Sequence, residues 1–194
     1  MNKILLILLS SLLLSNIIKE DDYLVNLQKG EINIGYKPSN TTWCYGNMTI
    51  NYSLDKILSV VEDVENYYKF FDSLSSTKIN KDDEVYIRID MPFPFTDRDY
   101  TVLFDKIIEE KETIYSYKAI QSKEYPIKSD CVRLTEAEGE WILRKINDNQ
   151  TFVRYTWNGD MKGDFPSWAY ESAWIQQGNE ILSCLSKEVE RRYK

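Results

Sequence analysis

The charged residues that could perform chemistry gather at one point of the sequence, in the triplet Asp97-Arg98-Asp99. A guanidinium group presents a fork of N–H donors that fits a carboxylate or a phosphate, so the triplet could hold the head group of a ligand. The triplet also opens a predicted strand. There Arg98 could instead fix the preceding loop, by pairing with a carboxylate or by capping carbonyl groups. The residue types alone leave both interpretations open.

A second polar group lies on the strand that precedes this triplet. Residues 85–90 alternate between apolar and polar side chains, which places Tyr86, Arg88 and Asp90 on one face. If that face points inward, Arg88 is a buried cation that needs a partner, and Asp90 or a negative group of a ligand could supply it.

The 194 residues offer few of the side chains that catalysis or metal binding usually requires. There is no histidine, so the commonest general base and the commonest zinc ligand are both missing. The three cysteines lack metal or redox spacing, and we predict no metal and no cofactor. Glu136, Glu138 and Glu140 share one face of a strand, a pattern more typical of a solvated face than of a site.

The overall composition narrows the class of partner. The formal charge of −7 argues against nucleic acid as a ligand. The chain contains 14 Tyr, 7 Phe and 5 Trp, which is rich in aromatic residues for its length. Aromatic side chains fill cores by default, and they also suit the wall of a pocket that holds a bulky apolar ligand.

A stiff aromatic loop connects the two predicted strands around the charged triplet. Its prolines, Pro92 and Pro94, each fix their own φ and push the preceding residue toward extended geometry. The loop is therefore stiff and extended, and it holds Phe93 and Phe95 outside the strand pairing. Either they plug the end of the core, or they form a lid over an apolar cavity or a tip that touches a membrane.

The elements that position these residues are mostly strands. We predict strands at residues 31–36, 48–52, 85–90, 98–108, 113–121, 132–144 and 151–158. Polar connections at 109–112 and 147–150 predict hairpins and hence an antiparallel meander. One amphipathic helix is predicted from Ser53, as N-cap, to Phe71, and residues 21–28 are predicted as a short helix or a loose segment.

A long helix is predicted from Pro166 to Arg192, since proline is well tolerated in a first helical turn. Its apolar face carries four residues at helical spacing: Trp174, Gly178, Ile181 and Leu185. About 27 residues at a rise of about 1.5 Å each span about 40 Å, enough to cover the open side of a curved sheet. The fold class is therefore α+β.

Three motifs together resemble the StAR-related lipid-transfer (START) domain family. Residues 92–100 resemble the family signature P-W-P-hydrophobic-S-D-R-D-hydrophobic. Residues 64–68 are similar to the family's D-V-E-x-Y-x-x-W run, and residues 163–168 resemble the G-x-hydrophobic-P-x-W turn that opens its last helix. The motifs occur in the family's order over roughly residues 27–193.

This resemblance implies the helix-grip fold, in which a curved antiparallel sheet wraps around a long C-terminal helix and encloses an apolar tunnel. We expect Trp174, Gly178, Ile181 and Leu185 to line the tunnel, with Gly178 leaving room for the ligand. The residues that we expect to close its mouth are Phe93, Phe95, Met161 and Phe165.

We expect Tyr86, Arg88 and Phe104 in the tunnel wall, where Phe104 stands about where the family's second arginine is expected. The resemblance favours a structural role for the loop and triplet residues Pro92, Pro94, Asp97, Arg98 and Asp99.

The function implied is binding of a lipid or other hydrophobic ligand without catalysis, with transfer of the ligand as a further expectation, by a monomer that contacts membranes transiently. Two alternatives stay open. A related polyketide cyclase or aromatase would need an inward-facing polar group with a perturbed pKa, such as Arg88, Asp90 or Tyr86. An envelope protein would instead fill the cavity with its own side chains.

The N-terminus has the features of a targeting segment. Lys3 precedes an apolar run of about 15 residues, shorter than the about 20 that span a bilayer. We therefore expect residues 1–18 to be a signal peptide, or else a short anchor, and the domain at 27–193 to be exported to the periplasm or secreted.

Overall fold

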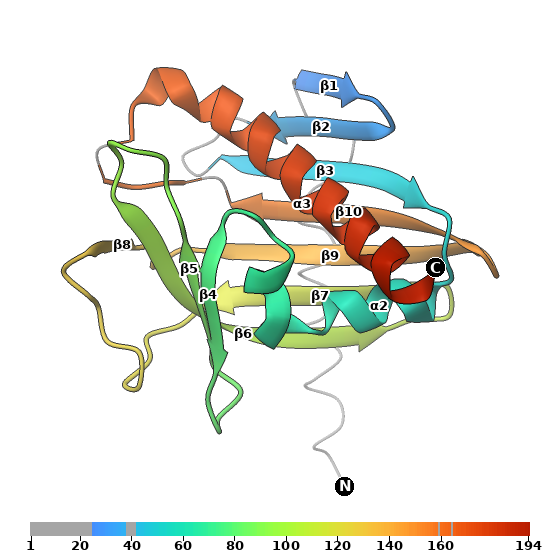
Figure 1. Ribbon diagram of the computed structural model, residues 1–194, viewed down its shortest axis with the longest axis horizontal. Helices are drawn as coiled ribbons and strands as arrows, with labels where there is room; N and C mark the ends of the chain where they lie inside the picture. Colours follow the sequence, from blue (N-terminus) through green and yellow to red (C-terminus); the bar gives the residue numbers. More distant parts are fainter. Residues whose placement is uncertain (1–24, 38–41, 159, 164) are drawn as a thin grey trace, which may run out of the picture.

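The chain was analysed as a computed structural model, which describes residues 25–37, 42–158, 160–163 and 165–194. It forms one open ten-stranded sheet with α3 lying obliquely across one face (Figure 1). The strand order is β1-β2-β3-β10-β9-β7-β6-β5-β4, and all of these neighbours are antiparallel; β8 lies off this path, parallel to β6.

The strands are β1 (Val25–Lys29), β2 (Ile32–Lys37), β3 (Trp43–Ile50), β4 (Leu74–Ile79), β5 (Val85–Ile89), β6 (Asp97–Ile108), β7 (Glu112–Ala119), β8 (Cys131–Arg133), β9 (Glu138–Asn147) and β10 (Gln150–Asn158). The helices are α2 (Leu54–Val61) and α3 (Tyr170–Tyr193), and the 3-10 turns are η2 (Val64–Lys69) and η3 (Ser167–Ala169). This arrangement is the α+β class predicted from the sequence.

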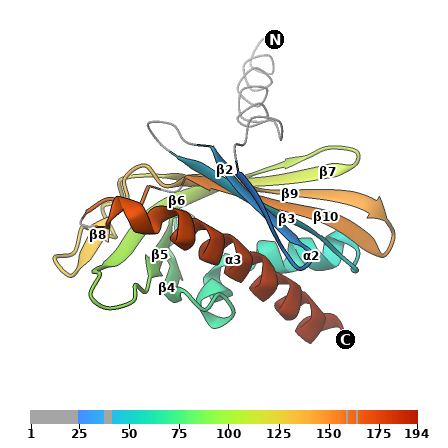
Figure 2. The ribbon, with the colours of Figure 1, turned by 90° about the horizontal axis from the view of Figure 1, so that it is seen from above.

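Helices α2 and α3 lie on the same side of the sheet, and we call the face they cover the inner face (Figure 2). Side chains alternate along each strand, so in β9 the buried Trp141 and Leu143 point inward while Glu140 and Ile142 point outward. The core lies between the inner face and α3, where Leu182, Leu185 and Val189 of α3 are fully buried.

Several predicted elements differ from those in the structure. The helix predicted over 53–71 ends at Val61 and continues as η2, because the Tyr67 hydroxyl donates to the carbonyl of Val61 and closes the chain back on α2. Ser53 makes no side-chain capping hydrogen bond. Part of the segment predicted as helical or loose is strand β1, since it pairs with β2. Strand β4 was not predicted, and the strand predicted at 132–144 is divided between β8 and β9.

The C-terminal end of α3 is fixed by charge. Glu188 is buried and accepts hydrogen bonds from Arg191 and Arg192, at 2.6 Å and 2.7 Å for the two Nε donors. Arg192 also donates to Asp63 beside η2, at 2.6 Å. These contacts anchor the end of α3 to the segment between α2 and η2.

The predicted signal peptide, residues 1–18, lies outside the described residues. Within the described residues, no helix combines the length and the apolar character that a membrane crossing requires. Cys44, Cys131 and Cys184 are buried, free thiols.

Candidate ligand-binding site

A cavity of about 40 Å³ lies between the inner face of the sheet and α3. Its wall is aromatic and aliphatic, with Ile87 and Ile89 from β5, Tyr100 from β6 and Trp141 from β9. Helix α3 contributes Gln177 and Ile181. Among the described residues, no aspartate, glutamate, lysine or arginine side chain lines this cavity, so it suits an uncharged, apolar group.

Tyrosine hydroxyls supply most of the polarity in this wall. The hydroxyls of Tyr117 and Tyr155 lie 2.6 Å apart and share a hydrogen bond. Burial raises the pKa of Tyr155 to about 12 and raises the pKa values of Tyr117 and Tyr100 above their ordinary range. These phenols are therefore protonated at neutral pH, and they can donate or accept hydrogen bonds but cannot serve as bases.

A second cavity of about 30 Å³ adjoins the first at the end of the sheet near residues 160–161. Five residues line both spaces, namely Ile89, Tyr100, Tyr117, Tyr155 and Gln177. Trp157 and Met161 line only the smaller one. The two cavities are thus neighbours that share one wall.

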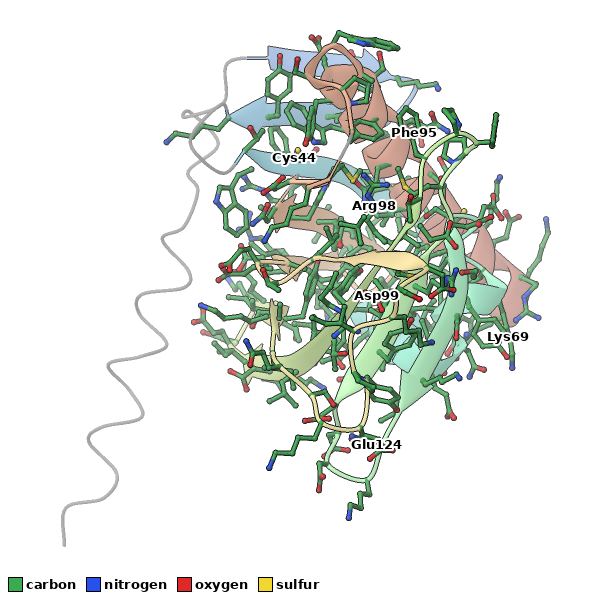
Figure 3. The ribbon with its side chains drawn as sticks, turned by 90° about the vertical axis from the view of Figure 1, so that its left-hand side faces the viewer. Cys44, Lys69, Phe95, Arg98, Asp99 and Glu124 are labelled. Atoms are coloured by element: carbon green, nitrogen blue, oxygen red, sulfur yellow. The ribbon has the colours of Figure 1, made fainter. Side chains whose placement is uncertain are left out.

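Aromatic side chains from two loops pack together at the start of α3. Phe95, on the loop between β5 and β6, packs on Phe165 with ring centroids 4.9 Å apart, and Phe165 packs on Tyr170 at 5.1 Å. Figure 3 shows Phe95 on this loop close to α3. Phe93 points away and is 98% exposed. Of the two phenylalanines expected to close the mouth, only Phe95 packs against another aromatic ring.

The buried side chain of Arg98 connects the same two loops by hydrogen bonds. Its side chain is fully buried and donates hydrogen bonds to the carbonyls of Met161 and Lys162, each at 3.0 Å, and to that of Thr96. The guanidinium also lies 5.8 Å from the centre of the Phe165 ring. Arg98 therefore caps carbonyls and fixes the loops.

The two carboxylates of the triplet lie in ion pairs on the outer face. Asp99 is fully buried and forms a bidentate pair with Arg133 of β8, with N–O distances of 2.7 Å and 2.9 Å. Asp97 accepts hydrogen bonds from Arg88 at 2.7 Å and 2.9 Å. Each of these carboxylates has a protein partner and contacts no part of the cavity wall.

The expected positions of Tyr86 and Arg88 in the tunnel wall are not those in the structure. Both side chains lie on the outer face of β5, because Ile87 and Ile89 take the inward positions of the alternation. Tyr86 stacks on Tyr125 at 5.2 Å, and Arg88 pairs with Asp97 and with Asp130 rather than with Asp90.

The predicted residues of α3 do not all reach the cavity. Ile181 lines it, as does Phe104 of β6. Trp174 packs between the rings of Tyr36 and Tyr170, at 5.0 Å and 5.3 Å. Leu185 is fully buried farther along α3.

The expectation that Gly178 leaves room for a ligand is wrong. A Cβ atom at this position would lie 2.9 Å from Cη2 of Trp157, and Ile34 is almost as near. The absence of a side chain therefore allows α3 to pack closely on the sheet.

The expected open tunnel is also absent from the described part of the chain. The interior spaces of about 40 and 30 Å³ hold a few water-sized groups, whereas pockets for drug-sized ligands measure about 300–1,000 Å³. In this conformation the region between the sheet and α3 is largely filled by its own aromatic side chains.

Sequence reasoning missed most of the cavity wall, including Tyr100, Tyr117, Tyr155, Trp157 and Gln177. For β10 a signal was present, because Val153, Tyr155 and Trp157 alternate with polar residues. Gln177 lies four residues before Ile181 on the helix, and this spacing places both on one face.

Comparisons with known proteins support the fold. No family model matches the sequence. An uncharacterized protein from Pseudomonas aeruginosa is 26% identical over 140 residues, covering 70% of this chain and 69% of that protein.

Solved structures give broader matches at low identity. A STAR-related lipid transfer protein fragment from Xanthomonas axonopodis has a TM-score of 0.78 at 17% identity, covering 88% of this chain and 99% of that one. Human StAR-related lipid transfer protein 5 has a TM-score of 0.83 at 12% identity, covering 96% and 95%. The Zhui aromatase/cyclase from Streptomyces sp. R1128 has a TM-score of 0.57 at 17% identity, covering 79% and 96%.

These similarities, together with the open sheet and its long C-terminal helix, show that the chain has the helix-grip fold. Within that class its fold is that of the START domains, which confirms the resemblance seen in the sequence motifs at the level of the fold.

Proposed function

We propose that this protein binds a lipid or another uncharged hydrophobic ligand between the inner face of the sheet and α3. The observation that carries the proposal is the cavity wall, which is aromatic and aliphatic and has no charged side chain among the described residues. Proteins with this fold that are named for lipid transfer support the same function. Transfer of the ligand between membranes is part of the proposal.

Binding requires the interior to expand, because a cavity of about 40 Å³ is too small for a lipid chain. We propose that the Pro92–Phe95 loop and the first turns of α3 form the gate. The Phe95–Phe165–Tyr170 ring cluster links the loop to α3 through aromatic contacts, and the guanidinium of Arg98 packs against the Phe165 ring from the interior. Separating the rings exposes apolar surface, which a ligand entering the interior can cover again.

Mass spectrometry of the organic extract of the purified protein tests this function. The parent is expected to retain a defined apolar molecule, and Ile181→Trp, which adds bulk inside the cavity, is expected to retain at most a tenth as much. Lys187→Trp adds the same group on the exposed side of α3 and serves as the matched control. An extract without such a molecule, from a parent that also binds neither an NBD-labelled phospholipid nor an NBD-labelled sterol, would refute the proposal.

A polyketide cyclase or aromatase is the alternative function, since one such enzyme has a similar fold. The geometry gives it less support. Tyr86 and Arg88 lie on the outer face, Asp90 is exposed, and the tyrosines of the cavity are protonated at neutral pH. Because no carboxylate or amine lines the larger cavity within the described residues, binding without catalysis is the better proposal.

Transient membrane contact belongs to the proposed cycle of ligand exchange. Phe93 is 98% exposed and Trp168 is 81% exposed. They lie on neighbouring segments, which the contact between Phe95 and Phe165 holds together. Exposed aromatic side chains at one end of a molecule suit the interface of a bilayer.

We also propose that the protein acts as an exported monomer. The apolar run after Lys3 supports the export. N-terminal sequencing of protein recovered from its native compartment, together with the mass of the native particle by light scattering, tests both statements.

A further inference from the structure

Two residues that line the smaller cavity each carry a buried polar group that lacks a hydrogen-bond partner. These groups are the indole Nε1 of Trp157 and the amide Oε1 of Gln177, and neither has a partner within the described part of the chain. Trp157 is 2% exposed. Buried polar groups are nearly always satisfied in native proteins, so a pair of unsatisfied groups on residues that line one small space requires an explanation.

The two groups are complementary in kind. The indole N–H can only donate a hydrogen bond, and the amide carbonyl oxygen can only accept one. A group that satisfies both must offer a lone pair to Trp157 and a proton to Gln177. A hydroxyl group has both, whereas an ether or ketone oxygen has no proton and a protonated amine has no lone pair.

The surroundings also select against a negatively charged group. Glu138 and Asp160 contribute to the lining of the smaller cavity, so an ionised carboxylate or phosphate would meet like charge there. The space of about 30 Å³ is large enough for a hydroxyl oxygen but not for a bulky head group.

We propose that the smaller cavity is the recognition site for the hydroxyl group of an apolar alcohol. In this arrangement the hydroxyl oxygen accepts from Nε1 of Trp157, and the hydroxyl proton is donated to Oε1 of Gln177. The apolar body lies in the adjoining cavity, which shares Gln177, Tyr117 and Tyr155 with the smaller one. This inference rests on the proposed function and adds the chemical class of the ligand.

Two isomeric probes test the inference on the unmodified protein. The probes are 1-dodecanol and methyl undecyl ether, which have the same atoms but differ in the hydroxyl proton. Their affinities are compared by displacement of the dye N-phenyl-1-naphthylamine. An unsatisfied buried group costs about 1–3 kcal/mol, and about 1.4 kcal/mol is a factor of ten, so the alcohol is expected to bind about 5- to 140-fold tighter.

Variants then assign the preference to the two side chains. Gln177→Met replaces the amide by an apolar group of similar length and is expected to reduce the ratio of affinities to about twofold or less. Trp157→Phe removes the N–H donor and is expected to weaken binding of the alcohol. Gln176→Met, on the exposed side of the same helix turn, is the matched control and is expected to keep the ratio of the parent.

The possible outcomes separate this inference from the proposed function. Equal affinity of the parent for both isomers would overturn the hydroxyl site while leaving apolar binding in place, and would mean that a water molecule satisfies Trp157 and Gln177. A preference that survives in a folded Gln177→Met variant would overturn the assignment to this residue. If neither isomer displaces the dye, the proposed function fails together with the inference.

Discussion

The substitution Asp99→Asn tests the structural role of the charged triplet most directly. It removes one charge from the protein interior while keeping the shape of the side chain. Asp99 is fully buried, and the side chain of its partner Arg133 is 8% exposed. The pair is bidentate, with N–O distances of 2.7 Å and 2.9 Å. After the substitution, Arg133 is a buried cation without a carboxylate.

The expected loss of stability follows from that geometry. Removing one partner of a buried ion pair costs about 3–5 kcal/mol. Arg133 keeps hydrogen bonds to the carbonyls of Tyr125 and Pro126, at 3.1 Å and 3.3 Å, so the loss should fall near the lower limit. We expect the free energy of unfolding to decrease by about 3 kcal/mol, a large part of the about 5–15 kcal/mol typical of a domain.

Equilibrium unfolding in urea, followed by tryptophan fluorescence, measures the change. Asp130→Asn is the control, because Asp130 is 61% exposed and its partner Arg88 keeps Asp97, so we expect an unchanged unfolding midpoint. The double variant with Arg133→Met should recover part of the loss, since it removes the unpaired charge. A decrease below about 1 kcal/mol for Asp99→Asn would refute the argument that this pair holds β8 on β6.

Three further predictions concern the mouth, the helix contact and the response to acid. Phe93→Asp should leave the unfolding midpoint unchanged and reduce sedimentation with phosphatidylcholine vesicles several-fold, because Phe93 is exposed; unchanged sedimentation would exclude this loop as a membrane contact. Gly178→Ala should lower the free energy of unfolding in urea by about 1–2 kcal/mol, because the new Cβ atom clashes with Trp157 and this cost exceeds the gain from the higher helix propensity of alanine. A stabilised variant would contradict the close contact. Hydrogen bonding from Arg191 lowers the pKa of Glu188, so its contribution is present above the unfolded pKa of about 4.3 and is lost as the pH falls below it. Glu188→Gln should therefore reduce stability at pH 7 and flatten its decrease between pH 5 and 3, and parallel pH profiles of the two proteins would refute this.

Local patterns were sufficient to predict most of the sheet and the last helix. The hairpins β6–β7 and β9–β10 were predictable because polar connections separate alternating segments, and α3 because Pro166 precedes a one-sided apolar pattern. Strand β4 was not predictable from local patterns, because Leu74–Ile79 is polar and largely exposed. It becomes a strand by pairing with β5. The break after Val61 likewise depends on a contact of Tyr67.

The candidate site was less predictable, because a correct strand does not by itself define which face is inward. Residues 85–90 were assigned the right alternation, but the polar face was placed inward. Successive side chains of a strand point to opposite faces, so a wrong inward face places both Tyr86 and Arg88 on the wrong side of the sheet. The apolar set of Val85, Ile87 and Ile89 was the available signal, since apolar side chains mark the buried face.

The two ends of α3 are held by different kinds of contact, and this difference bears on the gate that we propose. Toward the C-terminus the helix is bound by charged groups, through Glu188 and Arg192 to Asp63, while Glu180 accepts a hydrogen bond at 2.7 Å from the backbone N–H of Ser73. At the N-terminus, the contacts of Tyr170 with Phe165 and Trp174 are aromatic. Separating the charged contacts would leave buried polar groups unsatisfied, whereas separating the rings of Phe95, Phe165 and Tyr170 exposes mainly apolar surface that a hydrophobic ligand can cover. We therefore expect the helix to open at its N-terminal end, beside the aromatic loop.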